Sequence, residues 1–335
     1  MYETGSNQDY FVGHFAEEHR GILKLQYPME HGVVTDWEAM ENIWDYCYKQ
    51  LQVDKEEHPV LLTEAALNPT SNRERTTQIF FEKFEVPYFF CVMQAVLGLY
   101  ATLKTTGIVL DCGDGVTHAV PIYNGYAITS AINRVDIAGR DVTRYLQLLL
   151  RLKGFNMDTS SELEMVRSIK ESESIMYVAT SYNKELGLYE RGEAADERVY
   201  QLPDGSPVTL GSERFKAPEI LFRPDIIGLE YQGVHQVLFN SIQKTDRDLR
   251  PQMYSDIVLA GGSTMFNKFP DRILHELHQL TQERTHIRLM AAQNRKNSVW
   301  IGGSILASLS TFKDMWITRQ QYLEHGSSIV LRNTS

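Results

Sequence analysis

The segment with the clearest capacity for chemistry combines two carboxylates with two glycines. The apolar residues 108–110 lead directly into the run Asp-Cys-Gly-Asp-Gly at residues 111–115. Glycines allow a tight turn whose backbone N–H groups can point toward an anion. The two aspartates repel a phosphate group, but they can hold one through a divalent cation, which prefers carboxylate, water and phosphate oxygens. Because Asp-Gly is also a strong hairpin signal, the segment predicts either a phosphate-binding turn or a plain hairpin.

A second glycine-rich turn lies much further along the chain. The strand-like run 256–260 leads into the sequence Gly-Gly-Ser-Thr-Met at residues 261–265, and a helix is expected over residues 270–280. A glycine pair at this place lets a nucleotide approach the backbone, close to the N-terminus of the following helix. The segment is neither a G-x-G-x-x-G fingerprint nor a P-loop, so a tight strand–helix turn is the alternative. Two such turns in one chain favour a nucleotide site more than either turn does alone.

Other candidates for chemistry are weaker. His275 and His278 are three residues apart and no third ligand follows them, which favours a solvated helix face over a zinc site. The chain contains no G-x-S-x-G elbow of a serine hydrolase. His118 alternates with apolar residues after the first turn, so it is either a buried core histidine or a histidine near a catalytic water.

The composition limits the class of protein. Of the 335 residues, 43% are hydrophobic and 10% are aromatic, which is typical of a packed globular chain long enough for two domains. The net charge of −10 argues against general nucleic-acid binding, which requires a basic surface. No apolar run approaches a membrane span, and the first residues lack the features of a signal peptide. The three widely separated cysteines fit a reducing compartment better than a disulfide framework.

The elements that position these turns alternate between strand-like and helix-like patterns, as in α/β layers. Short runs of branched apolar residues predict buried strands at 60–63, 107–110 and 256–260. Apolar residues recurring three or four positions apart predict amphipathic helices. These helices are 37–51 with Asp36 as its N-cap, 142–153 ended by Gly154, and 304–312 opened by the sequence Gly-Gly-Ser.

Two local features refine this pattern. The spacing of Ser71 with Glu74, and of Ser161 with Glu164, predicts a capping box at the start of a helix in each case. Residues 187–195 are charged and lack periodicity, so they are expected to form a surface loop.

Several stretches make the sequence resemble the actin family. Residues 110–118 resemble the second phosphate-binding loop of actin, residues 260–265 resemble its adenosine loop, and residues 298–309 are nearly identical to actin. Residues 27–32 and 61–65 are similar as well, and the resemblance runs through nearly the whole chain. It implies an actin-like ATPase fold, in which two related, ribonuclease H-like α/β domains lie around a nucleotide cleft.

The resemblance also implies a domain division. The first domain comprises residues 1–101 and 298–335, and residues 1–27 are the remnant of its small subdomain. The second domain comprises residues 102–297, with 138–229 as its small subdomain. In the family, strands that carry a first phosphate-binding loop precede the segments seen here, so we expect an N-terminally truncated member of the fold.

The site residues implied by the resemblance carry over position by position. Asp111 would hold magnesium through water, while Gln94 would orient an attacking water with help from His118. The family activity implied is a slow ATPase at most, and with the first phosphate-binding loop absent we expect this chain to be inactive. The residues implied to bind ATP or ADP with magnesium are Asp111, Gly113, Asp114, Gly115, Val116, Lys170, Glu171, Gly261, Gly262, Ser263, Met265, Phe266 and Lys296.

Within the family, residues 134–146 and 118–121 most resemble the centractin class of actin-related proteins, which forms the short filament of dynactin. This implies a cytoplasmic, cytoskeletal protein that assembles with its own copies or other actin-like subunits, with dynactin-type subunits and, indirectly, with dynein and microtubules. No nucleic-acid partner is expected. A conventional actin-like filament protein and a nuclear actin-related scaffold of a chromatin-remodelling complex are the alternatives. The residues implied to form an apolar partner groove are Tyr100, Ala101, Thr105, Ile305, Leu306, Leu309, Thr311 and Met315.

Overall fold

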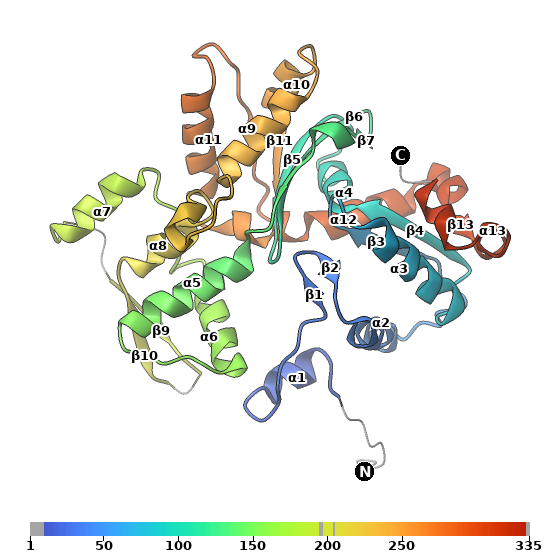
Figure 1. Ribbon diagram of the computed structural model, residues 1–335, viewed down its shortest axis with the longest axis horizontal. Helices are drawn as coiled ribbons and strands as arrows, with labels where there is room; N and C mark the ends of the chain where they lie inside the picture. The colour runs from blue at the N-terminus through green and yellow to red at the C-terminus, as the bar shows by residue number, and fades with distance from the viewer. Residues whose placement is uncertain (1–9, 194–196, 204, 333–335) are drawn as a thin grey trace.

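The computed structural model describes residues 10–193, 197–203 and 205–332 (Figure 1). Two main sheets, one of six strands and one of three, form its framework, and helices pack around both of them. Among the described residues, no helix has the length and apolar character needed to cross a membrane.

The larger sheet carries the first glycine-rich turn. Its strand order is β12-β11-β5-β6-β7, with β8 paired to β6. Every residue of β5 is buried, as expected for a strand covered on both faces. The strands expected at 107–110 and 256–260 are confirmed as β5 and β11. The bounds are β5 (Gly107–Cys112), β6 (Thr117–Tyr123), β7 (Tyr126–Ala127), β8 (Asn133–Val135), β11 (Ile257–Ala260) and β12 (Leu289–Met290).

The smaller sheet has the order β13-β4-β3 and lies on the side of the molecule that also holds the C-terminal helices (Figure 1). β3 runs parallel to β4, and β13 runs antiparallel to β4. The strand expected at 60–63 is confirmed as β3. The bounds are β3 (Val60–Glu64), β4 (Tyr88–Met93) and β13 (Ile317–Thr318), with the helices α3 (Thr70–Glu82) and α13 (Arg319–His325) beside them.

Two helices, α4 (Gln94–Tyr100) and α12 (Ser298–Ser308), pack closely on each other next to the sheets. A Cβ atom on Gly302 would lie 1.8 Å from the backbone oxygen of Leu97, so the contact between the two helices requires glycine. The glycines therefore lie inside α12. The expectation that they open a helix over 304–312 is wrong, because the helix begins at Ser298.

The remaining helices flank the larger sheet in two groups (Figure 1). The apolar face of α5 packs Val142, Leu146 and Leu150 into the core that contains the β5 residues Ile108 and Leu110. The first group is α5 (Gly139–Leu152), α6 (Ser160–Glu171), α7 (Tyr182–Glu190) and α8 (Glu213–Glu219), with the hairpin β9 (Arg198–Gln201) and β10 (Pro207–Leu210). The second group is α9 (Val234–Lys244), α10 (Arg250–Ser255) and α11 (Phe269–Leu280). The division of the chain into two domains stays a prediction.

The N-terminal part has little regular structure before its long helix. The helix expected at 37–51 is confirmed as α2, and Asp36 caps it by accepting a hydrogen bond from the backbone N–H of Ala39 at 3.0 Å. The elements are α1 (His14–Glu18), the short hairpin β1 (Met29–Glu30) and β2 (Val33–Val34), and α2 (Trp37–Leu51).

Both expected capping boxes are wrong. α3 begins at Thr70 after Pro69, so Ser71 lies within the helix and caps nothing. The box of α6 is formed by Thr159 and Glu162, two residues before the expected pair. Thr159 and Glu162 have the same three-residue spacing as Ser161 and Glu164, so the spacing alone does not tell at which residue α6 begins.

The surface loop expected at 187–195 is also wrong in part. Residues 187–190 form the last turn of α7, which ends at Glu190. Residues 194 and 195 lie outside the described residues.

Candidate functional site

The first glycine-rich turn is a β-hairpin that also lines a cavity. In the pairing of β5 with β6, Asp111 lies opposite His118 and Cys112 lies opposite Thr117, so residues 113–116 form the turn. The hairpin prediction is therefore confirmed. Gly113 also lines a cavity of about 430 Å³. A hairpin at this place is therefore compatible with a phosphate-binding turn.

The two glycine-rich turns meet. β11 runs parallel to β5 and its Ala260 lies beside Asp111, so the turns that follow both strands emerge at the same edge of the sheet. The Ser263 hydroxyl donates a hydrogen bond of 2.7 Å to the backbone oxygen of Gly113. Gly261 adopts a φ of 87°, and a Cβ there would lie 2.3 Å from the backbone oxygen of Cys112. Only glycine fits this close approach.

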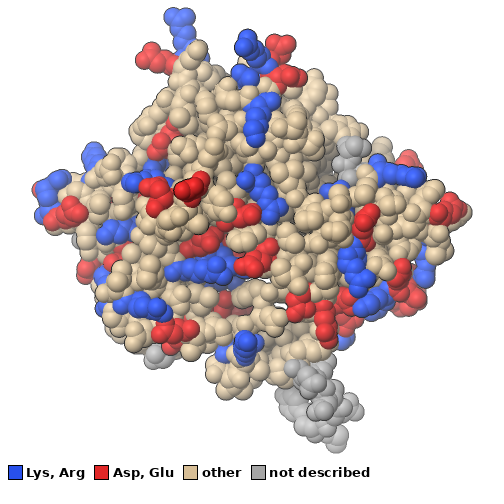
Figure 2. All heavy atoms as spheres, in the orientation of Figure 1, with Lys and Arg blue, Asp and Glu red and all other residues tan. Residues whose placement is uncertain are grey.

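Most of the expected site residues lie together on the wall of this cavity. Figure 2 shows acidic and basic side chains side by side along the middle of the visible face of the molecule. The expected residues that line the cavity are Gln94, Asp111, Gly113, Asp114, Lys170, Glu171, Gly261, Gly262, Ser263, Met265, Phe266 and Lys296.

Three expected residues lie outside this lining. Gly115 and Val116 are covered by the turn between β1 and β2: a hydrogen bond of 2.9 Å joins the His31 ring to the backbone oxygen of Gly115, and a Cβ on Gly32 would lie 3.5 Å from Val116. His118 is 1% exposed and sits behind Asp111 on the neighbouring strand.

Asp111 is a buried carboxylate facing the cavity. Burial raises its pKa above the usual range, and the nearby His118 only partly offsets this effect. The His118 Nε2 lies 3.9 Å from the Asp111 carboxylate, too far for a hydrogen bond. Burial also lowers the pKa of His118, which favours its neutral form, and neither of its ring nitrogens has a hydrogen-bond partner among the described residues. Asp111 therefore lacks a cation on the cavity side within the described part of the chain.

Lys170 supplies a buried positive charge at the opposite wall. Its Nζ donates to the backbone oxygen of Gly139 at 3.0 Å and lies 4.0 Å from the carboxylate of Asp114. Burial lowers the pKa of this amine, and the carboxylate of Asp114 opposes that effect. Lys170 belongs to α6, so the helix brings a cation to the turn that carries both aspartates.

The N-terminus of α5 holds the first turn in place. The backbone N–H of Gly139 donates to the oxygen of Gly113 at 3.0 Å, and that of Arg140 donates to the oxygen of Asp114 at 2.8 Å. The first N–H groups of a helix have no partner within the helix, and here they bind the turn. The position of the turn is therefore tied to the position of α5.

The sequence reasoning missed several lining residues. The most informative is Arg167, which lies three and four residues before Lys170 and Glu171 and so shares their helix face. Its Nε donates to Glu171 at 3.0 Å, and Lys296 contacts the same carboxylate at 3.3 Å. Extending the face of α6 by one turn would have found it. The other missed residues are Ser172, Glu173, Met176, Asn267 and Val299.

The residues expected to form a partner groove lie on α4, α12 and the segments that follow them. Leu306 is 8% exposed and packs with Leu97 and Phe312, so it is part of the core. Leu309 and Met315 are 49% and 45% exposed. The remaining members are half-buried Tyr100, Ala101 and Ile305 and exposed Thr105 and Thr311. Their role as a groove stays a prediction.

Fold and site together define an α/β protein whose sheet edge presents two glycine-rich turns to one cavity. The model of the actin family matches residues 1–335. An actin-like protein of Neurospora crassa is 52% identical over 319 residues, which cover 94% of this chain and 83% of that protein. The chain belongs to the actin family and has the actin fold.

Proposed function

We propose that the chain binds ATP or ADP with Mg²⁺ in the cavity between the two glycine-rich turns. The observation that carries this proposal is the direct contact of the turns, with Ser263 bonded to Gly113 and with Asp111 and Lys170 lining the same cavity. Members of the actin family bind nucleotide with a divalent metal, which supports the proposal.

The residues present fit a magnesium-bound nucleotide. Asp111 is buried and faces the cavity without an ion-pair partner there among the described residues, and magnesium is commonly held by one or two carboxylates together with water and phosphate oxygens. Among the described residues, no group of three or more His, Cys, Asp or Glu side chains could hold a metal by itself. In this proposal Asp111 holds the ion through water, and the ion neutralises phosphate charge.

The other lining residues divide between the parts of the nucleotide. The backbone of the first turn would face the phosphates, and Lys170 with Glu171 would contact the ribose and base. The second turn and Lys296 would hold the adenosine. Gln94 lines the cavity and would orient a water molecule. His118 does not reach the cavity and would act through Asp111, as a positioning residue.

We further propose that the protein is the filament-forming subunit of a dynactin-like complex, of the centractin class, and so supports motor-driven transport along microtubules. The family is generally cytoskeletal, and the relative from Neurospora crassa is an actin-like protein. The centractin-like sequence of residues 134–146 supports this finer assignment. That stretch includes most of β8 and the first part of α5, whose N-terminus binds the first turn.

Affinity purification of the tagged full chain from a cell extract tests the assembly. Dynactin subunits recovered in fixed stoichiometry would support the proposal. Recovery of chromatin-remodelling subunits, or of conventional actin filaments alone, would overturn it. Met315→Asp adds a test of the groove, because a charge at this exposed residue should reduce the recovery of actin-like subunits; Leu323→Asp, at a residue that is 76% exposed on α13, is the control.

A further inference from the structure

The second glycine-rich turn is held by a residue that does not line the nucleotide cavity. Arg295 begins the 3₁₀ turn Arg295–Asn297, which lies between β12 and α12 in the chain. Its guanidinium group donates three hydrogen bonds: Nε to the Thr264 hydroxyl at 3.1 Å, Nη2 to the Thr264 backbone oxygen at 2.8 Å and Nη1 to the Ala292 oxygen at 2.9 Å. Neither Arg295 nor Thr264 is among the residues that line the cavity.

The backbone of Arg295 holds the other end of the same turn. Its carbonyl oxygen accepts hydrogen bonds from the Gly261 N–H at 3.2 Å and from the Ser298 hydroxyl, at the start of α12, at 3.0 Å. The Thr264 hydroxyl in turn donates to the Gly261 oxygen at 2.8 Å. These bonds form a closed circuit through Gly261, Thr264 and Arg295, which we call the Arg295 bracket. The bracket fixes both ends of the turn to the N-terminus of α12.

The guanidinium group of Arg295 is a buried charge without a counter-ion. The residue is 8% exposed, and burial lowers its pKa without an opposing contribution from any carboxylate of the described residues. Buried charges in proteins are usually paired, because taking a charge out of water is costly. Arg272, which is 4% exposed, follows this rule and pairs with Glu219 and Glu276. The contacts of Arg295 go instead to oxygens of the second turn, which favours a role in placing that turn.

The part of the turn that the bracket encloses forms one side of the nucleotide cavity. Residues 261–263 line the cavity, and Lys296, the residue after Arg295, lines it as well. A Cβ on Gly262 would lie 3.9 Å from the Lys296 side chain, so the turn and this side chain are in van der Waals contact. A displacement of the bracket would therefore move the wall that is proposed to hold the adenosine.

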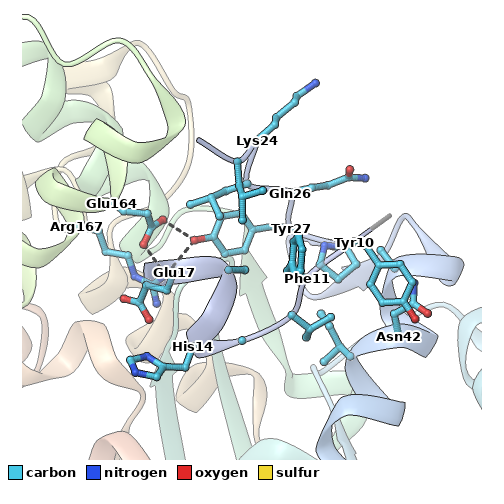
Figure 3. A pocket seen from close by; sticks show the side chains of 18 of the residues that line it. Tyr10, Phe11, His14, Glu17, Lys24, Gln26, Tyr27, Asn42, Glu164 and Arg167 are labelled. Carbon is cyan, nitrogen blue, oxygen red and sulfur yellow. Dashed lines mark hydrogen bonds and ion pairs between the residues drawn. The ribbon is translucent and has the colours of Figure 1, made fainter. Parts of the chain in front are cut away.

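The bracket borders the nucleotide cavity and not a second cavity, of about 840 Å³, which residues 10–28, the first turns of α2 and one face of α6 enclose. In Figure 3, Glu164 and Arg167 of α6 reach Tyr27 across one side of this second cavity. Tyr27 donates a hydrogen bond to Glu164, and Arg167 donates to the Tyr27 hydroxyl at 3.3 Å. No residue of the bracket lines the second cavity, so its effect should fall on the nucleotide cavity.

We propose that Arg295 is a positioning residue of the nucleotide site: it holds the second glycine-rich turn at the place where the adenosine part of the nucleotide binds. This inference rests on the proposed binding of ATP or ADP and goes beyond it, because Arg295 acts through Gly261 and Thr264 and does not touch the nucleotide. A planar guanidinium group donates to several oxygens in fixed directions, which a lysine ammonium on a flexible stem cannot do. The turn therefore requires the geometry of the guanidinium fork as well as its charge.

Calorimetric titration of the full chain with Mg-ATP, at a temperature where every variant is folded, tests the proposal. Arg295→Gln should lower the affinity about tenfold, because hydrogen bonds from a charged donor are lost. Arg295→Lys keeps the charge but not the fork and should lose nearly as much. Thr264→Val removes the hydroxyl of the bracket and should also bind more weakly, whereas Thr264→Ser keeps the hydroxyl and should bind as the wild type does. Wild-type affinity in either Arg295 variant, or an equal loss in both Thr264 variants, would overturn the proposal.

Arg272→Lys is the matched control, at a buried arginine that lines neither cavity. It should lower the melting temperature and keep the Mg-ATP affinity, so a loss equal to that of Arg295→Lys would show general destabilisation and overturn the proposal. Amide hydrogen exchange without nucleotide separates the bracket from the proposed function. In Arg295→Gln, residues 261–265 should exchange faster than in the wild type, and residues 113–116 should not. Unchanged exchange of residues 261–265 would overturn the positioning role alone, whereas a wild type that binds no Mg-ATP would overturn the proposed function and this inference with it.

Discussion

The two cavities of this molecule differ in what forms their walls. The smaller one, of about 430 Å³, is walled by two backbone turns that follow buried strands. The first turn is tied to the N-terminus of α5, and the second turn is bonded to the first. The larger one, of about 840 Å³, is walled by the side chains of α6 and by residues 10–28. The cavity that we propose for the nucleotide is therefore the smaller of the two. The proposal rests on backbone held in a fixed position next to a buried charge rather than on cavity size.

The cavities nevertheless share two residues, Arg167 and Glu171. Lys296 contacts Glu171 on the side of the smaller cavity. Arg167 contacts Glu171 and the Tyr27 hydroxyl on the side of the larger one. This chain of contacts links the expected adenosine wall to the N-terminal segment. The predictions below test whether the two cavities have the separate roles that their walls indicate.

The largest effect is expected from Asp111→Asn in the smaller cavity. A ligand at 100 times its dissociation constant stabilises the wild type by about 2.7 kcal/mol, and this variant should lose the magnesium-dependent part of that gain. Because burial raises the pKa of Asp111, its ionised form costs stability at neutral pH. Without nucleotide the variant should therefore be more stable than the wild type.

Thermal melts with and without Mg-ATP measure both effects of Asp111→Asn. Glu173→Gln, a charge removal elsewhere on the same cavity wall, is the control and should keep the magnesium dependence. An unchanged magnesium-dependent shift in Asp111→Asn would show that the metal is held elsewhere.

The second effect concerns the backbone of the second turn. Gly261→Ala should destabilise the protein by about 2 kcal/mol, because its φ of 87° is strained for alanine and its Cβ would meet the Cys112 oxygen. Gly262→Ala is a matched control, because the nearest atom to its Cβ, on Lys296, is 3.9 Å away. Urea unfolding of the two variants measures the difference. Equal stability of both would mean that the turn is not held as described.

The smallest effect is expected in the larger cavity. Tyr27→Phe removes the hydroxyl that joins Glu164 and Arg167, and Tyr27 is 48% exposed, so the loss of stability should be about 1 kcal/mol or less. Nucleotide affinity should change less than about threefold. Tyr126→Phe, at a tyrosine that is 65% exposed, is the control. A tenfold loss of nucleotide affinity in Tyr27→Phe would show that the cavities act as one site.

The parts of the fold that the sequence predicts well are those set by local pattern. The branched run before Asp111 is the buried strand β5, and Asp36 caps α2, because both depend on neighbouring residues alone. The sequence also indicates that the two glycine-rich turns belong to one site. They meet because β5 and β11 run parallel, so the turns that follow them emerge at the same edge of the sheet.

The features that sequence reasoning missed depend on contacts between distant residues. Glu164 was assigned to a capping box, but it accepts a hydrogen bond from Tyr27, 137 residues away. The glycines of α12 are expected to open a helix, but they lie inside it and allow close packing against α4. Likewise Gly115 and Val116 belong to the first turn, yet the hairpin around His31 covers them. No local pattern encodes which distant segment covers a given residue.

The most direct test of the central claim is isothermal titration calorimetry of the full chain with ATP, in the presence of Mg²⁺ and in the presence of EDTA. Asp111 on the wall of the smaller cavity and the contact between Ser263 and Gly113 predict binding at one site per chain, with an affinity that falls when the metal is removed. The absence of binding under both conditions, or one-site binding that is indifferent to Mg²⁺ and to Asp111→Asn, would contradict the assignment of this cavity to a magnesium-bound nucleotide.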